Sequence, residues 1–358
     1  MCVKSVTGCA RGYLPLSEHS VLSSQAINLA WGTGMELSVI IVNWNTGDSL
    51  RDCLVSIRQN SANQKVKIII VDNASNDGSG AMVKTFFPEV TLIDSGGNIG
   101  FGRANNLGVA QADTPFILFL NPDTQVLGNS IDTMIDFLKA NPSVGAVGCK
   151  MKSPPGVDIP DAKAHTLGLQ WFPSPFTELL NILLLSGKTI EMFKKYLPYQ
   201  DPNESAYVSK LYGGCLMVRK ETLEQVGCFD ERFFMYAEDV DLCRRITEHG
   251  WKLYYLSEAE IMHQVGRASV KTSGDFSTLM RCESISKLMN KYYGKKGEVV
   301  YKIVIFAGSH VRLVILVILT VFSHFFSPGR KMDIRESLRK YKAMIQWSLN
   351  LQKPVITT

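Results

Sequence analysis

Two short acidic segments contain side chains that could bind a metal or move a proton. The first is Asn121-Pro122-Asp123, which follows the apolar run 115–120. A carboxylate just past a buried strand can hold a divalent cation on a diphosphate, because Mg²⁺ and Mn²⁺ prefer hard oxygen ligands. The same tripeptide is also a common turn, and taken alone the turn is favoured by about two to one.

The second acidic segment is Glu238-Asp239-Val240-Asp241, at the start of a predicted helix. The helix dipole favours acids in the first turn, and this structural role explains at least one of them. It does not explain the apolar run 233–236 just before them. A carboxylate beside apolar walls can have a raised pKa and act as a general base, and Asp239 is the candidate for that role.

Three further features could contact phosphate or metal. A single histidine is usually structural, but neutral imidazole also binds Mn²⁺, so His263 could complete a metal site with Asp123. Arg267 could hold a phosphate as a planar fork. The glycine-rich segment 96–102 does not match GxGxxG and follows the third predicted strand instead of the first. We interpret it as a tight turn into a helix, which still lets a ligand approach.

Strands and helices alternate at short spacing through residues 36–150. The expected strands are 39–42, 66–71, 90–93, 115–120 and 144–149, and the expected helices are 48–60, 78–87, 101–111 and 130–140. This alternation is typical of an α/β fold with a mostly parallel sheet covered by helices on both faces. Asn43, Asp72-Asn73 and Asn121-Asp123 each follow a strand, so we expect them to converge on one crevice beyond the carboxyl ends of the strands.

The second half of the chain is less regular. Prolines punctuate residues 151–206, where only 179–185 is a helix candidate. Order returns at 206–218. A helix is expected at 239–249, followed by two strands at 253–256 and 260–263.

Composition indicates a folded protein with a basic tail. The chain has 358 residues, of which 46% are hydrophobic and 20% charged, which excludes a disordered chain. Residues 287–358 hold 13 Lys/Arg and 3 Asp/Glu, a local net charge of +10. This asymmetry indicates that the C-terminal region meets an anionic surface, and not that the protein binds nucleic acid. Eight cysteines without metal spacing are expected to be reduced thiols.

The expected domain organisation has three parts. Residues 1–34 show no periodicity and no secretory signal, so they are a loose extension, or translation starts at Met35. Residues 35–285 form the main domain, and 286–358 form a basic, apolar membrane-associating region. The window 303–322 is long enough to span a bilayer, but Arg312 near its centre costs about 2.5–3.5 kcal/mol. An interfacial or re-entrant helix is favoured over a span by about two to one, with a buried soluble helix as the third alternative.

Many of these segments together resemble the family 2 glycosyltransferases, which are inverting enzymes of the GT-A fold, and the rhamnosyltransferase-type branch most of all. The matching segments are Ser38–Asn45, Val71–Ser75, Gly97–Phe101 with Asn105-Asn106, Phe119–Asp123, Gly213–Met217, Phe229–Glu231, Glu238–Leu242 with Arg245, and His263. They span residues 36–268, in the family's order and spacing.

The resemblance implies roles for residues at the donor site. Asp72 would accept a hydrogen bond from the pyrimidine base of the nucleotide, and Asn43 would lie along it. Asn98 and Arg103 lie in the segment that flanks the nucleotide. Asn121 stands where the family's Asp-X-Asp motif has its first acid, and would face the ribose or the sugar.

Other residues would carry the reaction and the metal. Asp123 would bind Mg²⁺ or Mn²⁺, with His263 and the diphosphate, and Arg267 would help on the leaving group. Gly213-Gly214 would let the backbone approach the donor sugar. Asp239 matches the general base, and its neighbour Glu238 is assigned to substrate binding.

The implied activity is transfer of a sugar, with rhamnose as the expected one, from a dTDP- or UDP-sugar to a hydroxyl of a lipid-linked glycan. It would take place at the cytoplasmic face of the inner or plasma membrane, on a peripheral or monotopic protein, in polysaccharide or O-antigen assembly. The alternative is an inactive member that binds nucleotide or glycan, which the presence of Asp123, Asp239 and His263 disfavours. A nucleotidyltransferase ranks low, because no Lys or Arg follows the first strand before Arg51.

Overall fold

The computed structural model describes residues 35–61, 66–154, 170–183, 200–264, 275–326 and 335–355. They all belong to one compact unit, Gly34–Thr358. The N-terminal extension 1–34 and Arg267 lie outside the described residues, as does much of the proline-rich segment 151–206.

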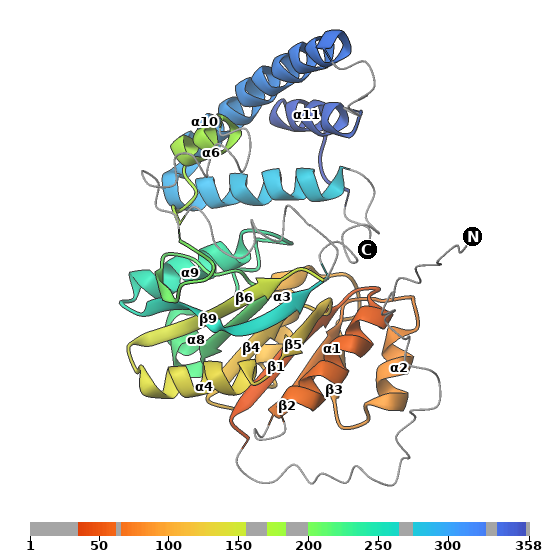
Figure 1. Cartoon of the computed structure of the whole chain (residues 1–358), viewed down its shortest axis with the longest axis vertical. Coiled ribbons are helices and arrows are strands. Elements are labelled where there is room, and N and C mark those ends of the chain that lie inside the picture. Colours follow the sequence, from red (N-terminus) through yellow and green to blue (C-terminus); the bar gives the residue numbers. More distant parts are fainter. Residues whose placement is uncertain are drawn as a thin grey trace, which may run out of the picture. The chain divides into compact units, whose positions relative to one another are not determined.

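The described strands form one nine-stranded sheet (Figure 1). They are β1 (Leu37–Asn43), β2 (Val66–Asp72), β3 (Thr91–Asp94), β4 (Phe116–Leu120), β5 (Thr124–Leu127), β6 (Val144–Lys152), β7 (Ala206–Val208), β8 (Cys215–Arg219) and β9 (Lys252–His263). The order is β3-β2-β1-β4-β8-β6-β9-β5, with β7 paired to β9. The strands β3, β2, β1 and β4 are parallel, and β8 joins β4 antiparallel to begin a mixed half.

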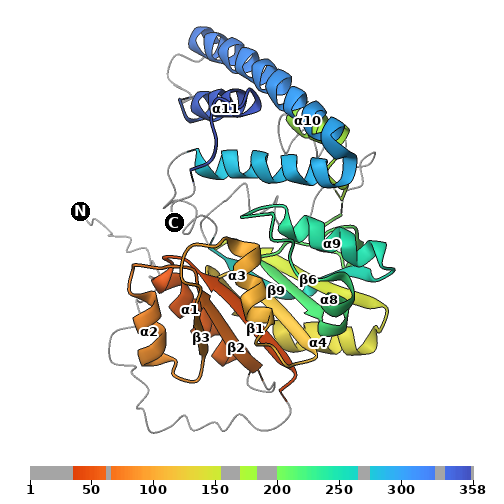
Figure 2. The same cartoon turned by 180° about the vertical axis from the view of Figure 1, so that it is seen from behind.

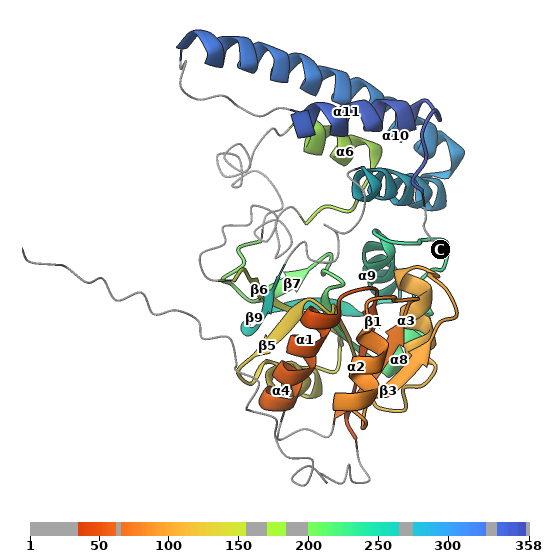
Figure 3. The ribbon, with the colours of Figure 1, turned by 90° about the vertical axis from the view of Figure 1, so that its right-hand side faces the viewer.

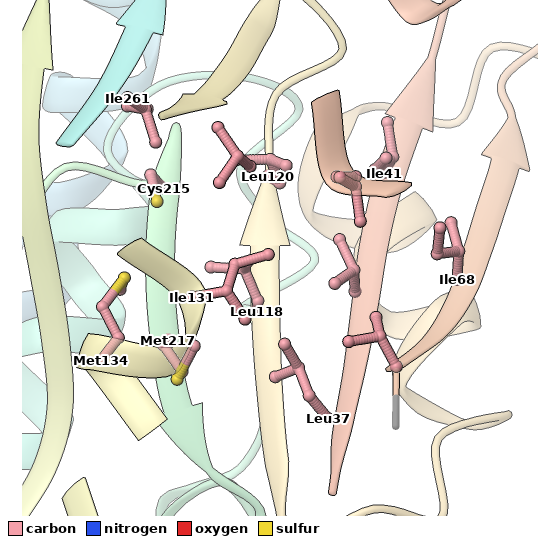
Figure 4. Close-up of a cluster of buried hydrophobic side chains, with 14 of the residues drawn as sticks. Leu37, Ile41, Ile68, Leu118, Leu120, Ile131, Met134, Cys215, Met217 and Ile261 are labelled. Atoms are coloured by element: carbon pink, nitrogen blue, oxygen red, sulfur yellow. The ribbon is translucent and has the colours of Figure 1, made fainter. Parts of the chain in front are cut away.

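Helices cover both faces of this sheet. They are α1 (Gly47–Asn60), α2 (Ser79–Phe86), α3 (Phe101–Val109), α4 (Ser130–Ala140), α8 (Lys220–Val226) and α9 (Glu238–Glu248). Side chains alternate along a strand, so Val39 and Ile41 of β1 pack in the core with α1, α2 and α4, while Ile40 packs on the opposite face with α8 and α9. Figure 1 shows α1 and α4 on one face, Figure 2 shows α3 and α8 on the other, and Figure 4 shows Ile41, Leu118 and Ile131 in the first core.

The structure confirms the strands and helices that were expected up to residue 150, adds one strand, β5, among them, and corrects two later predictions. The two strands expected at 253–256 and 260–263 are one strand, β9, in which residues 257–259 bulge out of register with β6. The helix expected at 179–185 is α6 (Pro175–Leu183), with residues 184 and 185 outside the described part. It starts earlier because Ser174 Oγ accepts from the backbone N–H of Thr177 and proline fits the first helical position. Besides β5, the structure adds β7 and α8, which were not expected.

The C-terminal region is helical. Helix α10 (Phe276–Phe326) has a break at Gly294, where φ is +65°, and the boundary expected at residue 286 falls inside this helix. Helix α11 (Arg335–Ser348) packs along it (Figure 3). Within the described residues, one helix, Phe276–Ile318, is long and apolar enough to cross a membrane. Only 22% of the most apolar 18-residue stretch of this helix is buried, so packing in the protein core does not explain why the stretch is apolar.

Candidate functional site

The carboxyl ends of β1 and β2 carry Asn43 and Asp72, which are paired in the parallel register. The Asn43 amide Nδ2 donates to Asp72 Oδ1 at 3.0 Å, and it also lies 2.9 Å from Ser75 Oγ and 2.7 Å from Ser79 Oγ. Thr46 Oγ1 donates to Asn43 Oδ1 at 2.7 Å. Asn43 is 1% exposed, whereas Asp72 is half-buried. The Asn43 side chain therefore holds Asp72 in place.

The glycine-rich segment begins beside Asp72, at the end of β3. Asn73 is buried, and its Nδ2 donates to Asn98 Oδ1 at 3.0 Å, while its Oδ1 accepts from the backbone N–H of Ile99 at 2.9 Å. Gly100 has φ +90°, and a Cβ there would lie 2.6 Å from the carbonyl oxygen of Phe234. The segment is a tight turn into α3, as predicted, and it packs against the loop that leads to Glu238 and Asp239.

Arg103 lies on the first turn of α3 and is exposed. Its Nε is 3.3 Å from Glu231 Oε2. The structure therefore directs this guanidinium toward the loop that contains Phe229–Glu231, and not toward Asp72.

Asp123 and His263 lie side by side although 140 positions separate them. Antiparallel pairing of β5 with β9 sets Thr124 opposite His263. Asp123 Oδ1 lies 3.1 Å from His263 Nε2, and Asp123 and His263 are 6% and 4% exposed. His263 Nδ1 is buried without a hydrogen-bond partner among the described residues. The same residues include no group of three or more His, Cys, Asp or Glu side chains placed to hold a metal ion.

Two glycines connect this pair to the candidate base. Asn121 donates its backbone N–H to the Gly214 carbonyl oxygen at 3.0 Å, and Gly213 donates its backbone N–H to Asp239 Oδ2 at 2.9 Å. A Cβ on Gly213 would lie 3.0 Å from Asp239 Cβ, and one on Gly214 would lie 2.4 Å from the Tyr212 ring. A Cβ would be crowded at Gly213 and would clash at Gly214, so glycine suits this close approach.

The candidate base lies in the first turn of α9. Tyr236 and Ala237, just before the helix, both have left-handed backbones, with φ +68° and +66°. Such conformations are strained for non-glycine residues and cluster at functional sites. Burial raises the pKa of both Glu238 and Asp239, and the neighbouring charge of Asp239 also raises that of Glu238, to about 8. A hydrogen bond from the Gly213 N–H acts in the opposite direction on the pKa of Asp239.

Two residues near the site were not predicted. The Tyr212 ring lies 6.1 Å from that of His263, centroid to centroid, and packs beside Gly214. Lys210 is half-buried, its Nζ donates to the Trp171 carbonyl oxygen at 3.3 Å, and its charge acts to lower the pKa of Asp239. Both lie within three positions before Gly213, and this closeness to the matching segment Gly213–Met217 was the signal that could have indicated them.

The predicted residues thus form two groups on neighbouring strand ends. One group contains Asp72 with Asn43 and Asn98, and the other connects Asp239, through Gly213-Gly214 and Asn121, to Asp123 and His263. Asp72 ends β2 and Asn121 follows β4, and β1 lies between these two strands, so two strand spacings, roughly 10 Å, separate the strand ends that carry Asp72 and Asn121. This span suits a ligand with a polar group at each end.

Comparison with known proteins gives the family. The family model described as "Glycosyl transferase family 2" matches residues 38–227. The N-acetylglucosaminyl-diphospho-decaprenol L-rhamnosyltransferase of Mycobacterium tuberculosis is 32% identical over 248 residues, covering 63% of this chain and 75% of that protein. The rhamnosyltransferase WbbL of Escherichia coli K12 is 28% identical over 239 residues, covering 63% of this chain and 82% of that protein.

Two solved structures share the fold. The mannosyltransferase PcManGT of Pyrobaculum calidifontis, in complex with GDP-Man and Mn²⁺, has a TM-score of 0.52 at 15% identity, covering 89% of this chain and 88% of its own. GalNAc-T7, with UDP, GalNAc and Mn²⁺, has a TM-score of 0.54 at 14% identity, covering 88% of this chain and 56% of its own. The fold is therefore GT-A, with helices on both faces of a mixed sheet. Because the family model matches more than half of the chain, this protein belongs to glycosyl transferase family 2 and is an inverting glycosyltransferase.

Proposed function

We propose that the enzyme transfers L-rhamnose or a related hexose from a dTDP- or UDP-sugar to a hydroxyl of a glycan carried on a lipid diphosphate. The Mycobacterium tuberculosis relative supports both the sugar and the lipid-linked acceptor, and the Escherichia coli relative supports the sugar. The observation that carries the proposal is the continuous series of contacts from Asp239 through Gly213-Gly214 and Asn121 toward the pair Asp123 and His263.

The nucleotide is proposed to lie along the ends of β2, β1 and β4. Asp72 would accept a hydrogen bond from the pyrimidine base, with Asn98 beside it. Asn43 is buried under this surface, so it would act by orienting Asp72 instead of touching the nucleotide. Asn121 would face the ribose or the sugar. Arg103 pairs with Glu231, so it would flank the nucleotide by holding the loop that contains Phe229–Glu231.

A divalent cation, Mg²⁺ or Mn²⁺, fits Asp123 and His263. A buried carboxylate and an imidazole are donors that such ions accept. His263 Nε2 lies beside Asp123, and the other ring nitrogen, Nδ1, is buried with no hydrogen-bond partner in the described part of the chain. When bound, the cation would offset the negative charge that builds on the departing diphosphate. Because this pair supplies only two side chains, the diphosphate oxygens are the expected further ligands. Arg267 is proposed to contact the same diphosphate as it leaves.

Asp239 is proposed as the general base. It would take the proton of the acceptor hydroxyl while that oxygen forms its bond to the anomeric carbon. In the same step the bond from this carbon to the diphosphate oxygen breaks, and the nucleoside diphosphate leaves with the electron pair. A single displacement inverts the anomeric centre without a covalent enzyme intermediate. Glu238, buried beside Asp239, would line the substrate site in its neutral form.

The enzyme is further proposed to act at the cytoplasmic face of the membrane. The apolar side chains exposed on α10 recur at helical spacing, and the tail that carries them is basic. The exposed residues on this stripe are Val299, Val300, Ile303, Phe306, Val314 and Val317. A lipid-linked acceptor would bring its sugar to a site held at that surface.

Transfer from dTDP-rhamnose, UDP-sugars and GDP-mannose to a synthetic N-acetylglucosaminyl-diphospho-lipid tests this proposal, with Mn²⁺ or with EDTA. We expect metal-dependent transfer from a dTDP- or UDP-sugar, with inversion seen in the product's NMR spectrum. Asp239→Asn should lose transfer but keep stabilisation by the nucleotide, and Asp123→Ala should lose both. Asp113→Asn, which changes an exposed carboxylate paired with Lys67, is the matched control. A folded wild type that binds nucleotide but transfers from no donor would favour the inactive, binding-only alternative.

A further inference from the structure

We propose that Lys291, on α10, is a positioning residue for Asp239 because it ties together the two ends of the segment that presents this base. The proposal rests on the role proposed for Asp239. The segment runs from Asp230 to Asp241 and includes the strained residues Tyr236 and Ala237. We call it the base segment.

Lys291 contacts both ends of the base segment. Its Nζ lies 2.8 Å from Asp230 Oδ2 and also donates to Asp241 Oδ1. Asp241 is fully buried and further accepts from Arg245 Nε and from the Tyr292 hydroxyl, each at 2.8 Å. Burial acts to raise the pKa of Asp230, but hydrogen bonds from Arg232 and Lys291 outweigh it and hold the pKa below its usual range. One ammonium thus bridges two carboxylates that would otherwise repel each other.

The same face of α10 holds the middle of the base segment. Ser284 Oγ donates to the Met235 carbonyl oxygen at 2.6 Å, and Lys287 Nζ donates to that of Arg232 at 3.0 Å. Residues 284, 287 and 291 lie three and four positions apart, so they share one face of the helix. Phe233 and Ala237, in the base segment, are buried in one apolar cluster with Leu288 of α10. Helix α10 therefore fixes this segment at both ends and between them.

This arrangement explains how the left-handed pair before Glu238 is maintained. Residues in such conformations persist only when their surroundings hold them. Removal of the Lys291 ammonium would leave Asp241 buried with less compensation and release Asp230 from Asp241. The base segment would then loosen, and Asp239 would move relative to Gly213. A displacement of about 1 Å can cost about 100-fold in rate.

We call the bridge from Lys291 to Asp230 and Asp241 the clasp. Hydrogen exchange of the full chain tests this clasp without any substrate. In Lys291→Met we expect the amides of residues 231–240 to exchange at least about tenfold faster than in the wild type, with smaller acceleration in Ser284→Ala. Lys295→Met is the matched control, because this lysine lies on the same helix and its side chain is 74% exposed. Equal protection of residues 231–240 in Lys291→Met and the wild type would overturn the proposal.

Kinetics then test whether the clasp positions the base. We expect kcat of Lys291→Met to fall by about 10- to 100-fold while KM for the donor changes less than about twofold, with most activity restored in Lys291→Arg. An unchanged kcat, or an equal loss in Lys295→Met, would overturn the positioning role. If the wild type transfers no sugar, the proposed function fails, and the exchange experiment still decides whether the clasp exists. If Lys291→Met does not fold, Ser284→Ala, which removes the hydrogen bond to the Met235 carbonyl oxygen, supplies the comparison with the wild type.

Discussion

Glu238 is expected to make the free energy of unfolding depend on pH, separately from any role in catalysis. Its carboxyl is buried, and Oε2 has no hydrogen-bond partner among the described residues. With its pKa raised to about 8, the folded protein keeps the proton that the unfolded chain releases near the ordinary value of 4.5. Between these two values the folded state binds more protons, so the free energy of unfolding falls as pH rises.

Glu238→Gln should remove this slope. Glutamine keeps the shape and the neutrality that the buried site favours, so the variant should unfold at a higher temperature than the wild type near pH 8 and at a similar one near pH 4.5. Thermal unfolding across this range measures the difference. Glu221→Gln, which changes an exposed carboxylate on α8, should leave the slope as in the wild type. A parallel slope in Glu238→Gln would show that the carboxyl is ionised in the folded protein.

Gly213 is predicted to matter for kcat through its lack of a side chain. A Cβ here would lie 3.0 Å from Asp239 Cβ and 3.3 Å from Asp239 Oδ2, so Gly213→Ala should push the Asp239 side chain slightly away from Gly213. We expect kcat to fall by about 10-fold with little change in donor binding, measured by steady-state kinetics and nucleotide-induced thermal shift. Asp113→Asn, which changes an exposed carboxylate paired with Lys67, is again the control. A fully active Gly213→Ala would mean that Asp239 need not occupy its observed position.

Local patterns and the resemblance indicated some residues of the candidate site and missed others for a physical reason. Asn43, Asp72 and Asp123 follow buried strands, and the family's motif order indicated His263 and Asp239. The bridge from Lys291 to Asp230 and Asp241 joins residues 50 to 61 positions apart. No local periodicity records a contact of that kind, because it depends on where α10 packs.

At the scale of the element, strand and helix types followed from the residues, but short and irregular elements did not. Continuous β-branched runs such as 39–42 are predicted as buried strands because both faces are covered. Strand β5 has four residues, two of them half-buried, and is too short for a periodic signal. In β9, Ser257 and Glu258 interrupt the apolar pattern where the strand bulges, so one strand was predicted as two.

The packing of α3 on the sheet gives a prediction about stability. A Cβ at Gly108 would lie 2.5 Å from Ile40 Cγ2 in the fully buried core. Ile40 is β-branched and cannot easily rotate away, so Gly108→Ala should lower the free energy of unfolding by about 1–3 kcal/mol, despite the higher helix propensity of alanine. Chemical denaturation measures this change.

Gly80→Ala on α2 is the matched control for that measurement. The nearest atom to a Cβ at Gly80 is Asp72 Oδ2 at 3.5 Å, an ordinary contact. Alanine should therefore raise the free energy of unfolding by about 0.5–1 kcal/mol through its helix propensity. If Gly108→Ala also raised the free energy of unfolding, close packing of α3 on Ile40 would not limit residue 108.

At the scale of the whole molecule, α10 has two sections with different surroundings. Before Gly294 its side chains hold the base segment, and after Gly294 it carries the exposed apolar stripe. A helix that both contacts the catalytic domain and lies on a bilayer would fix the distance of Asp239 from the membrane surface. This is consistent with an acceptor whose reacting sugar is joined to its lipid by a diphosphate.

The membrane prediction concerns Val314 and Val317, which are 58% and 53% exposed on that stripe. An aspartate in an apolar membrane environment costs up to about 2.5–3.5 kcal/mol, so Val314→Asp/Val317→Asp should lower binding to vesicles by at least about tenfold. Flotation with vesicles that contain phosphatidylglycerol measures it. Phe86→Asp, at an exposed apolar position on α2, is the control and should bind as the wild type does.

Because the tail is basic, binding of the wild type should weaken with neutral phosphatidylcholine vesicles or at high salt. Equal flotation of the double variant and the wild type would mean that this stripe does not meet the bilayer. Another surface would then have to hold the enzyme near the proposed lipid-linked acceptor.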